Sequence, residues 1–289
     1  MNKFSTLTKT ALTLALLAAG SAASAAVVGH YETCSATGNP NAVAPITTAG
    51  HTPVAVDIPD AATLAGLDML FVTNCSNSGV GAEYTANLAN ISAAVNAGMT
   101  LVVHDRWVDG GAGLVPGSAG ISFNRNFDDG ANIDFPAGSP ILSGPGGTLT
   151  DASMDGGNYS NHGFVDSTTL PAGAEVVAHR TLATEAVTVA YPFGAGTVVY
   201  STIPLDAYLG GSNLSMSTIY MPNVVDAFIG NTFAGCAGEG FVGDQLKLCK
   251  VICESPLTGK PITPLIRLWM NVYGSAPPCS AALMPALVR

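Results

Sequence analysis

Basic residues are scarce in this sequence. Of its 289 residues, ten are Lys or Arg and twenty are Asp or Glu, which gives a net charge of −10. Residues 27–235 hold 17 acidic residues, three arginines and no lysine, a net −14, whereas residues 236–289 carry a net +2. Nucleic acids and anionic membranes are bound through clusters of Lys and Arg, so we expect neither as a partner. Such an acidic body could attract cations, or it could serve only to keep the protein soluble.

Long apolar runs are also missing beyond the N-terminus. Lys3 and Lys9 precede an apolar run at 11–19 and a stretch of small residues at 20–26. This order is typical of a cleavable signal peptide, so we expect residues 1–26 to direct export of a bacterial protein that is secreted or periplasmic. The alternative is a membrane anchor, which needs about 20 apolar residues, more than this run supplies. No later stretch of the sequence is long and apolar enough to span a membrane.

Cysteines are few, and their number is even. In an exported chain an even count indicates disulfides, and we expect pairing within an early group of two and within a late group of four, whose three connectivities the sequence leaves open. The six are Cys34, Cys75, Cys236, Cys249, Cys253 and Cys279. A zinc site is the alternative for the late group. The spacing of Cys249 and Cys253, with three residues between them, is not that of a zinc knuckle, and no His lies nearby.

Hydrophobic residues make up 48% of the chain and charged residues 10%, so the chain can bury a core. Apolar strand-like runs alternate with helix-like segments over the first hundred residues. We expect strands at 27–31, 53–57, 67–74 and 100–104, and helices from about 41, at 60–64 and at 83–97. Such alternation predicts a mostly parallel sheet with helices on both faces.

The second half of the chain is organised differently. Residues 105–166 are rich in Gly, Asn, Asp and Ser without a regular pattern, which is typical of functional or partly disordered loops. Strands are expected at 175–180, 186–191 and 196–203, with Gly194-Ala195-Gly196 as a hairpin turn, and a closing helix at 217–229. The tail favours two amphipathic helices, at 244–253 and 261–273. The second should bury Leu265, Leu268, Trp269 and Val272 on one side.

Four of these stretches resemble segments of a known superfamily in their order and spacing. They are Leu67–Val72, Ala93–His104, Ser139–Gly144 and Phe193–Tyr200, and they are similar to the class I glutamine amidotransferase-like superfamily, within it to the ThuA-like (trehalose-utilisation) branch. The resemblance covers roughly residues 27–229. It implies a flavodoxin-like α/β domain at 27–233, followed by a small disulfide-stapled helical module at 234–289 that is similar to Cys-rich modules on other secreted bacterial proteins.

The departures from that family bear on activity. His104 stands where glutamine amidotransferases place a nucleophilic Cys, as a His does in ThuA-like proteins. Ser139 stands where a His is expected, and Pro204-Leu205-Asp206 follows the last strand in place of Gly-His. A His cannot accept an acyl group from glutamine as a thiolate does. We therefore expect no amidotransferase activity.

His104 begins the best candidate site. His104, Asp105, Arg106 and Trp107 follow a central strand, and ligands of open α/β sheets bind at the carboxyl ends of strands. An imidazole beside a carboxylate and a guanidinium suits acid–base work or the binding of an anionic or sugar ligand. In the alternative, Asp105 and Arg106 pair with each other and only stiffen the loop. Asn161 and His162 lie in a polar loop that could fold over the same edge, or simply be exposed.

Two further patterns carry chemistry. Asp128, Asp129, Asn132 and Asp134 offer oxygen ligands suited to Ca²⁺, although the spacing is not that of an EF-hand and most such runs are Asx turns. No cofactor other than Ca²⁺ is indicated. A Ser hydrolase needs Gly-x-Ser-x-Gly, and Gly117-Ser118-Ala119-Gly120 lacks one residue of it.

These observations favour a non-catalytic exported protein. We expect it to bind a small or carbohydrate-like ligand, or a partner, at the strand edge near His104. The carbohydrate comes from the ThuA-like resemblance alone. The alternative is an extracellular hydrolase in which His104 and Asp105, with His162 as a further candidate, act as acid and base. The tail could attach the protein to a cell-surface partner through an exposed Trp269, or could be a stapled cap with Trp269 buried.

Overall fold

The computed structural model describes residues 25–156 and 159–229, together with 245, 248–249, 252 and 263–273. Residues 1–24 of the predicted signal peptide lie outside the described residues. The same holds for Cys236, Cys253 and Cys279, for most of the helix expected at 244–253, and for the boundary expected at 233–234.

One mixed sheet of nine strands organises the described body, in the order β2-β1-β3-β4-β11-β10-β8-β5, with β9 paired to β10. Its strands are β1 (Val27–Glu32), β2 (Thr52–Ala55), β3 (Met69–Asn74), β4 (Thr100–Asp105), β5 (Phe123–Arg125), β8 (Gly163–Asp166), β9 (Glu175–His179), β10 (Glu185–Phe193) and β11 (Gly196–Ser201). The five strands β2, β1, β3, β4 and β11 run parallel to one another. The other four extend the sheet in antiparallel fashion. A separate ribbon pairs β6 (Ser143–Gly144) with β7 (Gly147–Thr148).

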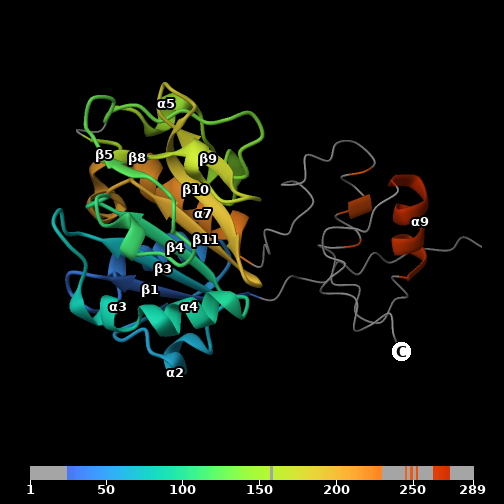
Figure 1. Cartoon of the computed structure of the whole chain (residues 1–289). Helices are drawn as coiled ribbons and strands as arrows, with labels where there is room; N and C mark the ends of the chain where they lie inside the picture. Colours follow the sequence, from blue (N-terminus) through green and yellow to red (C-terminus); the bar gives the residue numbers. More distant parts are fainter. Residues whose placement is uncertain are drawn as a thin grey trace, which may run out of the picture.

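Helices cover both faces of this sheet, as the alternating pattern predicted. The helices are α1 (Val43–Thr48), α2 (Ala61–Leu64), α3 (Ala82–Ala86), α4 (Leu88–Asn96), α5 (Asp151–Met154), α6 (Leu205–Ala207), α7 (Met221–Phe228) and α9 (Thr263–Tyr273), with short turns η1 (Pro40–Ala42), η2 (Gly111–Gly113), η3 (Ser167–Thr169), η4 (Tyr208–Ser212) and η5 (Met216–Tyr220). Helices α2, α3 and α4 lie together on one face (Figure 1) and share one apolar core. Helices α1 and α7 share the core of the other face.

The central strands follow from their apolar runs. Every residue of β3 and of β4 is buried, because helices close both faces of a parallel sheet. Helix α2 begins at Asp60, whose Oδ1 accepts the Thr63 amide at 2.8 Å, a standard N-cap. The single helix expected at 83–97 is wrong in one detail: it is split into α3 and α4 at Asn87, whose backbone leaves the helical region at φ −102° and ψ 7°.

The hairpin expected at Gly194-Ala195-Gly196 is confirmed, since β10 and β11 pair antiparallel on either side of it. Gly194 has φ +61°, a left-handed conformation that glycine adopts without strain. A Cβ on Gly196 would lie 2.2 Å from the carbonyl oxygen of Val95. The turn therefore depends on both glycines, which let it pass close to the end of α4.

The loop-like character expected for residues 105–166 needs correction. Strand β5 lies within this stretch, and β8 lies at its end. The two pair with each other, and β8 joins β10 at the sheet edge. Their short length hid them from a search for apolar periodicity. The sheet is consequently wider than a purely parallel one, and its added edge carries side chains that matter below.

The tail contains α9, which confirms the helix expected at 261–273. Trp269 is buried and lies 4.7 Å from the ring of Tyr273, one turn further on. Leu268 and Val272, however, are exposed, so the expectation that all four apolar residues of this helix are buried is wrong. Trp269 is buried, but the apolar residues on either side of it are not all covered. Cys249 is disulfide-bonded. No helix among the described residues is both long and apolar enough to cross a membrane.

Candidate functional site

The parallel strands end at a common edge, and four of the five end there in a polar residue. Glu32 ends β1, Asn74 ends β3, Asp105 ends β4 and Ser201 ends β11. The chain leaves β1 toward β2 on one side and leaves β3 toward β4 on the other, so the loops after β1 and β3 diverge. In open α/β sheets ligands bind at such a divergence. This edge is therefore the candidate ligand-binding region.

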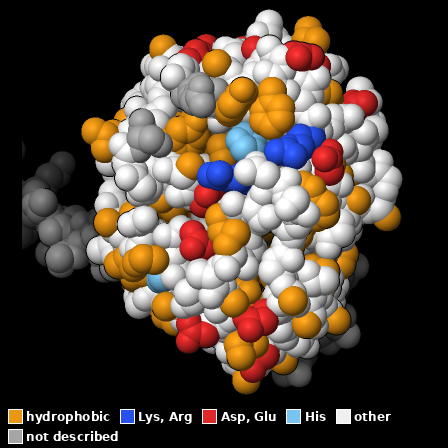
Figure 2. Space-filling model, turned by 90° about the vertical axis from the view of Figure 1, so that its left-hand side faces the viewer, with side chains coloured by type: hydrophobic (Ala, Val, Ile, Leu, Met, Phe, Trp, Pro, Cys, Tyr) orange, Lys and Arg blue, Asp and Glu red, His pale blue; other side chains and the backbone are white. Residues whose placement is uncertain are grey.

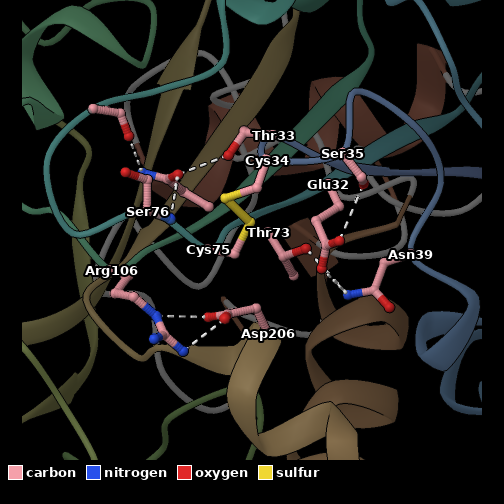
Figure 3. The surroundings of a disulfide bond; sticks show 12 residues. Glu32, Thr33, Cys34, Ser35, Asn39, Thr73, Cys75, Ser76, Arg106 and Asp206 are labelled. Atoms are coloured by element: carbon pink, nitrogen blue, oxygen red, sulfur yellow. Dashed lines mark hydrogen bonds and ion pairs between the residues drawn. A yellow bond between two sulfur atoms is a disulfide. The ribbon is translucent and has the colours of Figure 1, made fainter.

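A disulfide joins the two loops where they diverge. Cys34 and Cys75, from the loops after β1 and β3, are bonded to each other with their Cα atoms 5.9 Å apart. Figure 3 shows the bond between Glu32 and Thr73 on one side and the ion pair of Arg106 on the other. The pairing expected for the two early cysteines is confirmed. The loops after β1 and β3 are therefore joined by a covalent bond.

Asp105 is committed to holding this edge together. Its Oδ1 accepts the Asn74 amide at 2.7 Å and the Trp107 backbone N–H at 2.9 Å, and its Oδ2 accepts the Tyr200 hydroxyl at 2.8 Å and the Val108 backbone N–H at 2.9 Å. The carboxylate is fully buried. Burial raises the pKa of Asp105, and the four hydrogen bonds act in the opposite direction. With four donors in place, this carboxylate lacks a free position for a substrate.

His104 faces the opposite side of the sheet, because successive residues of a strand alternate. Its ring lies 5.1 Å from the Phe71 ring, and its Nε2 lies 3.1 Å from the Tyr220 hydroxyl. Nδ1 is buried and has no hydrogen-bond partner within the described part of the chain. Burial lowers the pKa of His104 to about 3, so the imidazole is neutral near pH 7. His104 and Asp105 thus do not meet each other, and neither side chain reaches the surface.

Arg106 turns outward, unlike His104 and Asp105, and its partner is not Asp105. The guanidinium binds Asp206 in bidentate fashion, with Nη2 to Oδ2 at 2.6 Å and Nε to Oδ1 at 3.2 Å. Pairing of Arg106 with Asp105 is therefore wrong, because Asp105 is turned into the loop. Asp206 belongs to α6, directly after β11. Burial raises the pKa of Asp206, and Arg106 lowers it.

His162 joins Arg106 at this edge, so of the two alternatives for its loop the structure has the one in which the loop folds over the strand edge. Its Nδ1 lies 2.8 Å from the carbonyl oxygen of Arg106. A carbonyl can only accept, so in the neutral ring the proton sits on Nδ1 and Nε2 keeps a lone pair. Burial lowers the pKa of His162; the hydrogen bond to the Arg106 backbone raises it, and the charges of Arg106 and Arg125 lower it further. His162 therefore presents a neutral hydrogen-bond acceptor near pH 7.

An exposed aromatic pair lies beside His162, and we call it the Phe127–Tyr159 platform. Phe127 is 40% exposed and Tyr159 45% exposed, and their ring centroids are 4.9 Å apart. The His162 ring is 5.2 Å from Phe127 and 6.1 Å from Tyr159. The guanidinium carbon of Arg125 lies 5.3 Å from the centre of the Phe127 ring. Figure 2 shows a histidine on this face between basic side chains, with hydrophobic side chains beside them.

Arg125 is held in place by a neutral partner. Its Nη1 and Nη2 donate to the backbone oxygen and to the side-chain oxygen of Asn77, each at 3.1 Å. Asn77 belongs to the loop after β3, so Arg125 connects the antiparallel edge of the sheet to the parallel strands. The platform is thereby fixed relative to Arg106 and Asp206.

Asn161 and Trp107 have structural surroundings. Asn161 is buried, its oxygen accepts from Arg180 at 2.6 and 2.9 Å, and its amide donates to the backbone oxygens of Asp129 and Asn132. Trp107 covers Gly110, where an added Cβ would lie 2.1 Å from the indole ring. Neither side chain faces the platform through any of these contacts. Both support the loops that carry it.

The acidic stretch proposed for Ca²⁺ serves mainly its own loops. The Asn126 side-chain amide donates to Oδ2 of Asp128, and the Thr181 backbone N–H donates to Oδ2 of Asp129. The Asn132 amide donates to Asp134 at 3.0 Å. Among the described residues no group of three or more His, Cys, Asp or Glu side chains is arranged to hold a metal ion. The stretch also contains an Asx turn, in which the Asp128 backbone N–H donates to Oδ1 of Asn126 at 2.7 Å.

Phe127, Tyr159, Arg125 and Asp206 were not among the residues selected from the sequence. Tyr159 lies three residues before His162 and Phe127 directly before the acidic run, but an isolated aromatic residue in a polar loop gives no motif. Asp206 was noted only as a departure from Gly-His. The signal that could have found them is exposure, which a sequence does not record.

Comparisons with known proteins complete this description. No protein-family model and no curated protein matches the chain. Among solved structures, the chain is similar to the exo-β-1,4-mannosidase Op5Man5 from Opitutaceae bacterium strain TAV5, with 14% sequence identity and a TM-score of 0.40 over 71% of this chain. The match spans 36% of the mannosidase chain. By its own strands and helices, the described body is a mixed α/β protein with a polar strand edge.

Proposed function

We propose that this chain is an exported bacterial protein that binds a carbohydrate-like ligand at the strand edge next to His104, on the Phe127–Tyr159 platform. The observation that carries the proposal is this pair of exposed rings. Exposed aromatic side chains that gather beside polar groups mark binding surfaces, and the apolar face of a pyranose ring fits against an aromatic ring.

The polar groups around the platform suit sugar hydroxyls. Nε2 of His162 accepts a hydrogen bond, and the Arg106–Asp206 pair offers both donors and acceptors. Both parts are rigid, since His162 is tied to the Arg106 carbonyl and Arg106 to Asp206. A prearranged site loses less entropy on binding.

The wider assignments rest on the following support. The parallel strands have the order β2-β1-β3-β4-β11, which is the flavodoxin-like order and agrees with the glutamine amidotransferase-like, ThuA-like resemblance. The disulfide between Cys34 and Cys75 is typical of an oxidising compartment and supports export through a signal peptide at 1–26. Attachment of the tail to a cell-surface partner stays a prediction.

A non-catalytic role is part of the proposal. Asp105 already receives four hydrogen bonds, and His104 lies within the core. The alternative, a hydrolase that uses these two residues as acid and base, requires both to leave their present partners. The binding function needs no such rearrangement.

The test is binding of neutral and acidic oligosaccharides to the mature protein, measured by isothermal titration calorimetry and by ligand-induced thermal stabilisation. Phe127→Ala and Tyr159→Ala should each weaken binding at least tenfold, about 1.4 kcal/mol, without unfolding the protein. Ile58→Ala is the matched control, because Ile58 is also exposed but follows β2 at the other margin of the sheet. Equal loss in all three variants, or binding by none of the sugars, contradicts the proposal.

A further inference from the structure

We infer that export cuts this chain between Ala25 and Ala26, and that the ammonium group created at Ala26 is held by Asp68 and His51 at the start of β1. This inference rests on the export that is part of the proposed function, and it adds the processing site and the position of the new N-terminus. It does not depend on the ligand. The observation behind it is the abrupt start of the backbone contacts at Ala26.

The hydrogen bonds of the folded chain begin at Ala26. Its carbonyl oxygen accepts the Thr52 backbone N–H at 2.9 Å, beside the parallel pairing of β1 with β2, and its N–H donates to Nδ1 of His51 at 3.3 Å. Ala25 is exposed and makes no hydrogen bond with any residue that the structure describes. The folded domain therefore uses Ala26 and does not use Ala25.

The sequence has a cleavage motif at the same place. Ala23-Ser24-Ala25 is an A-x-A motif, the kind after which signal peptides are cut. A cut one residue later would remove the acceptor of the Thr52 N–H and the donor to His51. The motif and the first folded contacts therefore agree on a cut between residues 25 and 26, one residue before the end of the predicted signal peptide at 1–26.

Asp68 is placed to bind the charge that this cut creates. Hydrolysis of the peptide bond by a signal peptidase adds one water and leaves a carboxylate on Ala25 and an amine on Ala26, which is mostly protonated at pH 7. Oδ2 of Asp68 accepts the Val27 backbone N–H at 2.7 Å, and the Asp68 N–H donates to the Val27 carbonyl oxygen at 2.9 Å. The carboxylate thus lies one peptide unit from the new ammonium. Hydrogen bonds that involve charged groups are stronger than those of a neutral amide.

Other cations do not compete for Asp68 in the described body. Residues 27–235 contain three arginines and no lysine, and each of these arginines has another partner among the described residues. The cut therefore supplies a positive charge that the sequence of the body does not place at Asp68. His51 precedes β2 and Asp68 precedes β3, so the ammonium fastens the start of β1 to both of its neighbouring strands.

The position of the cut is tested by producing the full chain with its own signal sequence in an exporting bacterium. Intact mass and N-terminal sequencing of the exported protein should show a chain that begins at Ala26. A chain that begins at Val27 or later, or at Ala25 or earlier, overturns the inference although the protein is exported. Retention of residues 1–24 refutes export together with the inference, whereas binding of sugars to the platform is measured independently of either result.

The role of Asp68 is tested by acetylating the Ala26 amine of the exported protein at pH 6.5. An α-amine reacts there in preference to lysine because its pKa is lower, and peptide mass mapping verifies that the lysines of the tail are unmodified. Acetylation keeps an N–H for His51 but removes the charge. At pH 7 in 20 mM NaCl, we expect Tm to fall by about 2 °C in the wild type, as for one exposed charge pair. In Asp68→Asn, which has already lost the pair, the fall should be less than half as large.

Asp57→Asn is the matched control. The Asp57 carboxylate is also exposed and accepts a hydrogen bond from the Thr37 hydroxyl, so this variant changes the net charge equally and should keep the full effect of acetylation. No fall of Tm in the wild type, or an equal fall in the wild type and in Asp68→Asn, shows that Asp68 does not hold the ammonium and overturns the inference.

Discussion

Asp105→Asn is the substitution that tests whether Asp105 holds the strand edge or serves a reaction. The wild-type carboxylate offers two oxygens to four donors, two at each oxygen. An asparagine keeps the shape but replaces one oxygen with an NH₂ group, which then faces two donors. Turning the new amide only changes which two donors are left without an acceptor.

The cost follows from these contacts. If the NH₂ group replaces Oδ2, the Tyr200 hydroxyl can rotate and accept, but the Val108 backbone N–H loses its partner. If it replaces Oδ1, the Trp107 N–H loses its partner instead. A buried donor without an acceptor costs about 1–3 kcal/mol, and the remaining bonds weaken because their acceptor is no longer charged. The relief of burying no charge offsets part of this. We expect a loss of about 3 kcal/mol in the free energy of unfolding.

The assay is urea unfolding followed by tryptophan fluorescence and circular dichroism, with thermal melts alongside. About 3 kcal/mol corresponds to a fall of roughly 6–12 °C in Tm for a domain of this size. Tyr200→Phe, which removes one of the four donors, should cost about 1 kcal/mol. Asp68→Asn is the surface control: the Asp68 carboxylate accepts a single backbone N–H, from Val27, and the change should cost less than the Asp105 variant. A loss below about 1 kcal/mol for Asp105→Asn would refute the reasoning. Wild-type stability combined with lost ligand turnover would favour the hydrolase.

Two further predictions concern the same edge. Replacing Cys34 and Cys75 with Ala removes a cross-link between positions 41 residues apart, for which chain entropy predicts at most about 4 kcal/mol of stabilisation. We expect the free energy of unfolding, measured with urea, to fall by about 2–4 kcal/mol. An unchanged urea midpoint would contradict this expectation. His104→Phe tests pH dependence. Because the folded-state pKa of His104 is about 3 and the unfolded value about 6.5, the unfolded state takes up the proton first, so stability falls as pH drops below about 6.5, by roughly 3 kcal/mol at pH 4.5. The variant should flatten this slope without abolishing it, since the pKa values of His30 and His162 are also lowered, and an unaltered slope would show that His104 is not its source.

The sheet was predictable because its signal is local. The apolar runs that become β3 and β4 are long enough to name a buried strand, and the Gly194-Ala195-Gly196 turn specifies its hairpin. The short strands β5 and β8 were not predictable, since a few residues of mixed polarity have no periodicity. They are strands because β10 offers an edge for β8 to pair with.

The site was predictable only in its location. The carboxyl end of β4 was correct as the place where polar groups gather, but the partners of those groups come from distant parts of the chain. Arg106 and Asp206 are 100 residues apart, and Arg125 and Asn77 are 48 apart. One sequence does not state which loops meet. It also does not state which face of a strand a side chain takes, and this is why His104 and Asp105, neighbours in sequence, do not act together.

The position of the platform follows from how the strand edge is closed. In a doubly wound sheet the loops after β1 and β3 would leave a crevice for a ligand, but here the disulfide between Cys34 and Cys75 joins them, and Asn74 at the end of β3 donates to Asp105 at the end of β4. The proposed ligand therefore binds beside these two loops rather than between them. The antiparallel strands β8 and β5 widen the sheet on that side: Arg125 ends β5, and Phe127 and Tyr159 lie in the loops that follow β5 and precede β8. Arg106 lies where the two halves meet, with its guanidinium on Asp206 and its carbonyl on His162. The disulfide therefore holds the loops of the parallel half together, and the antiparallel extension provides the surface on which we propose that the ligand binds.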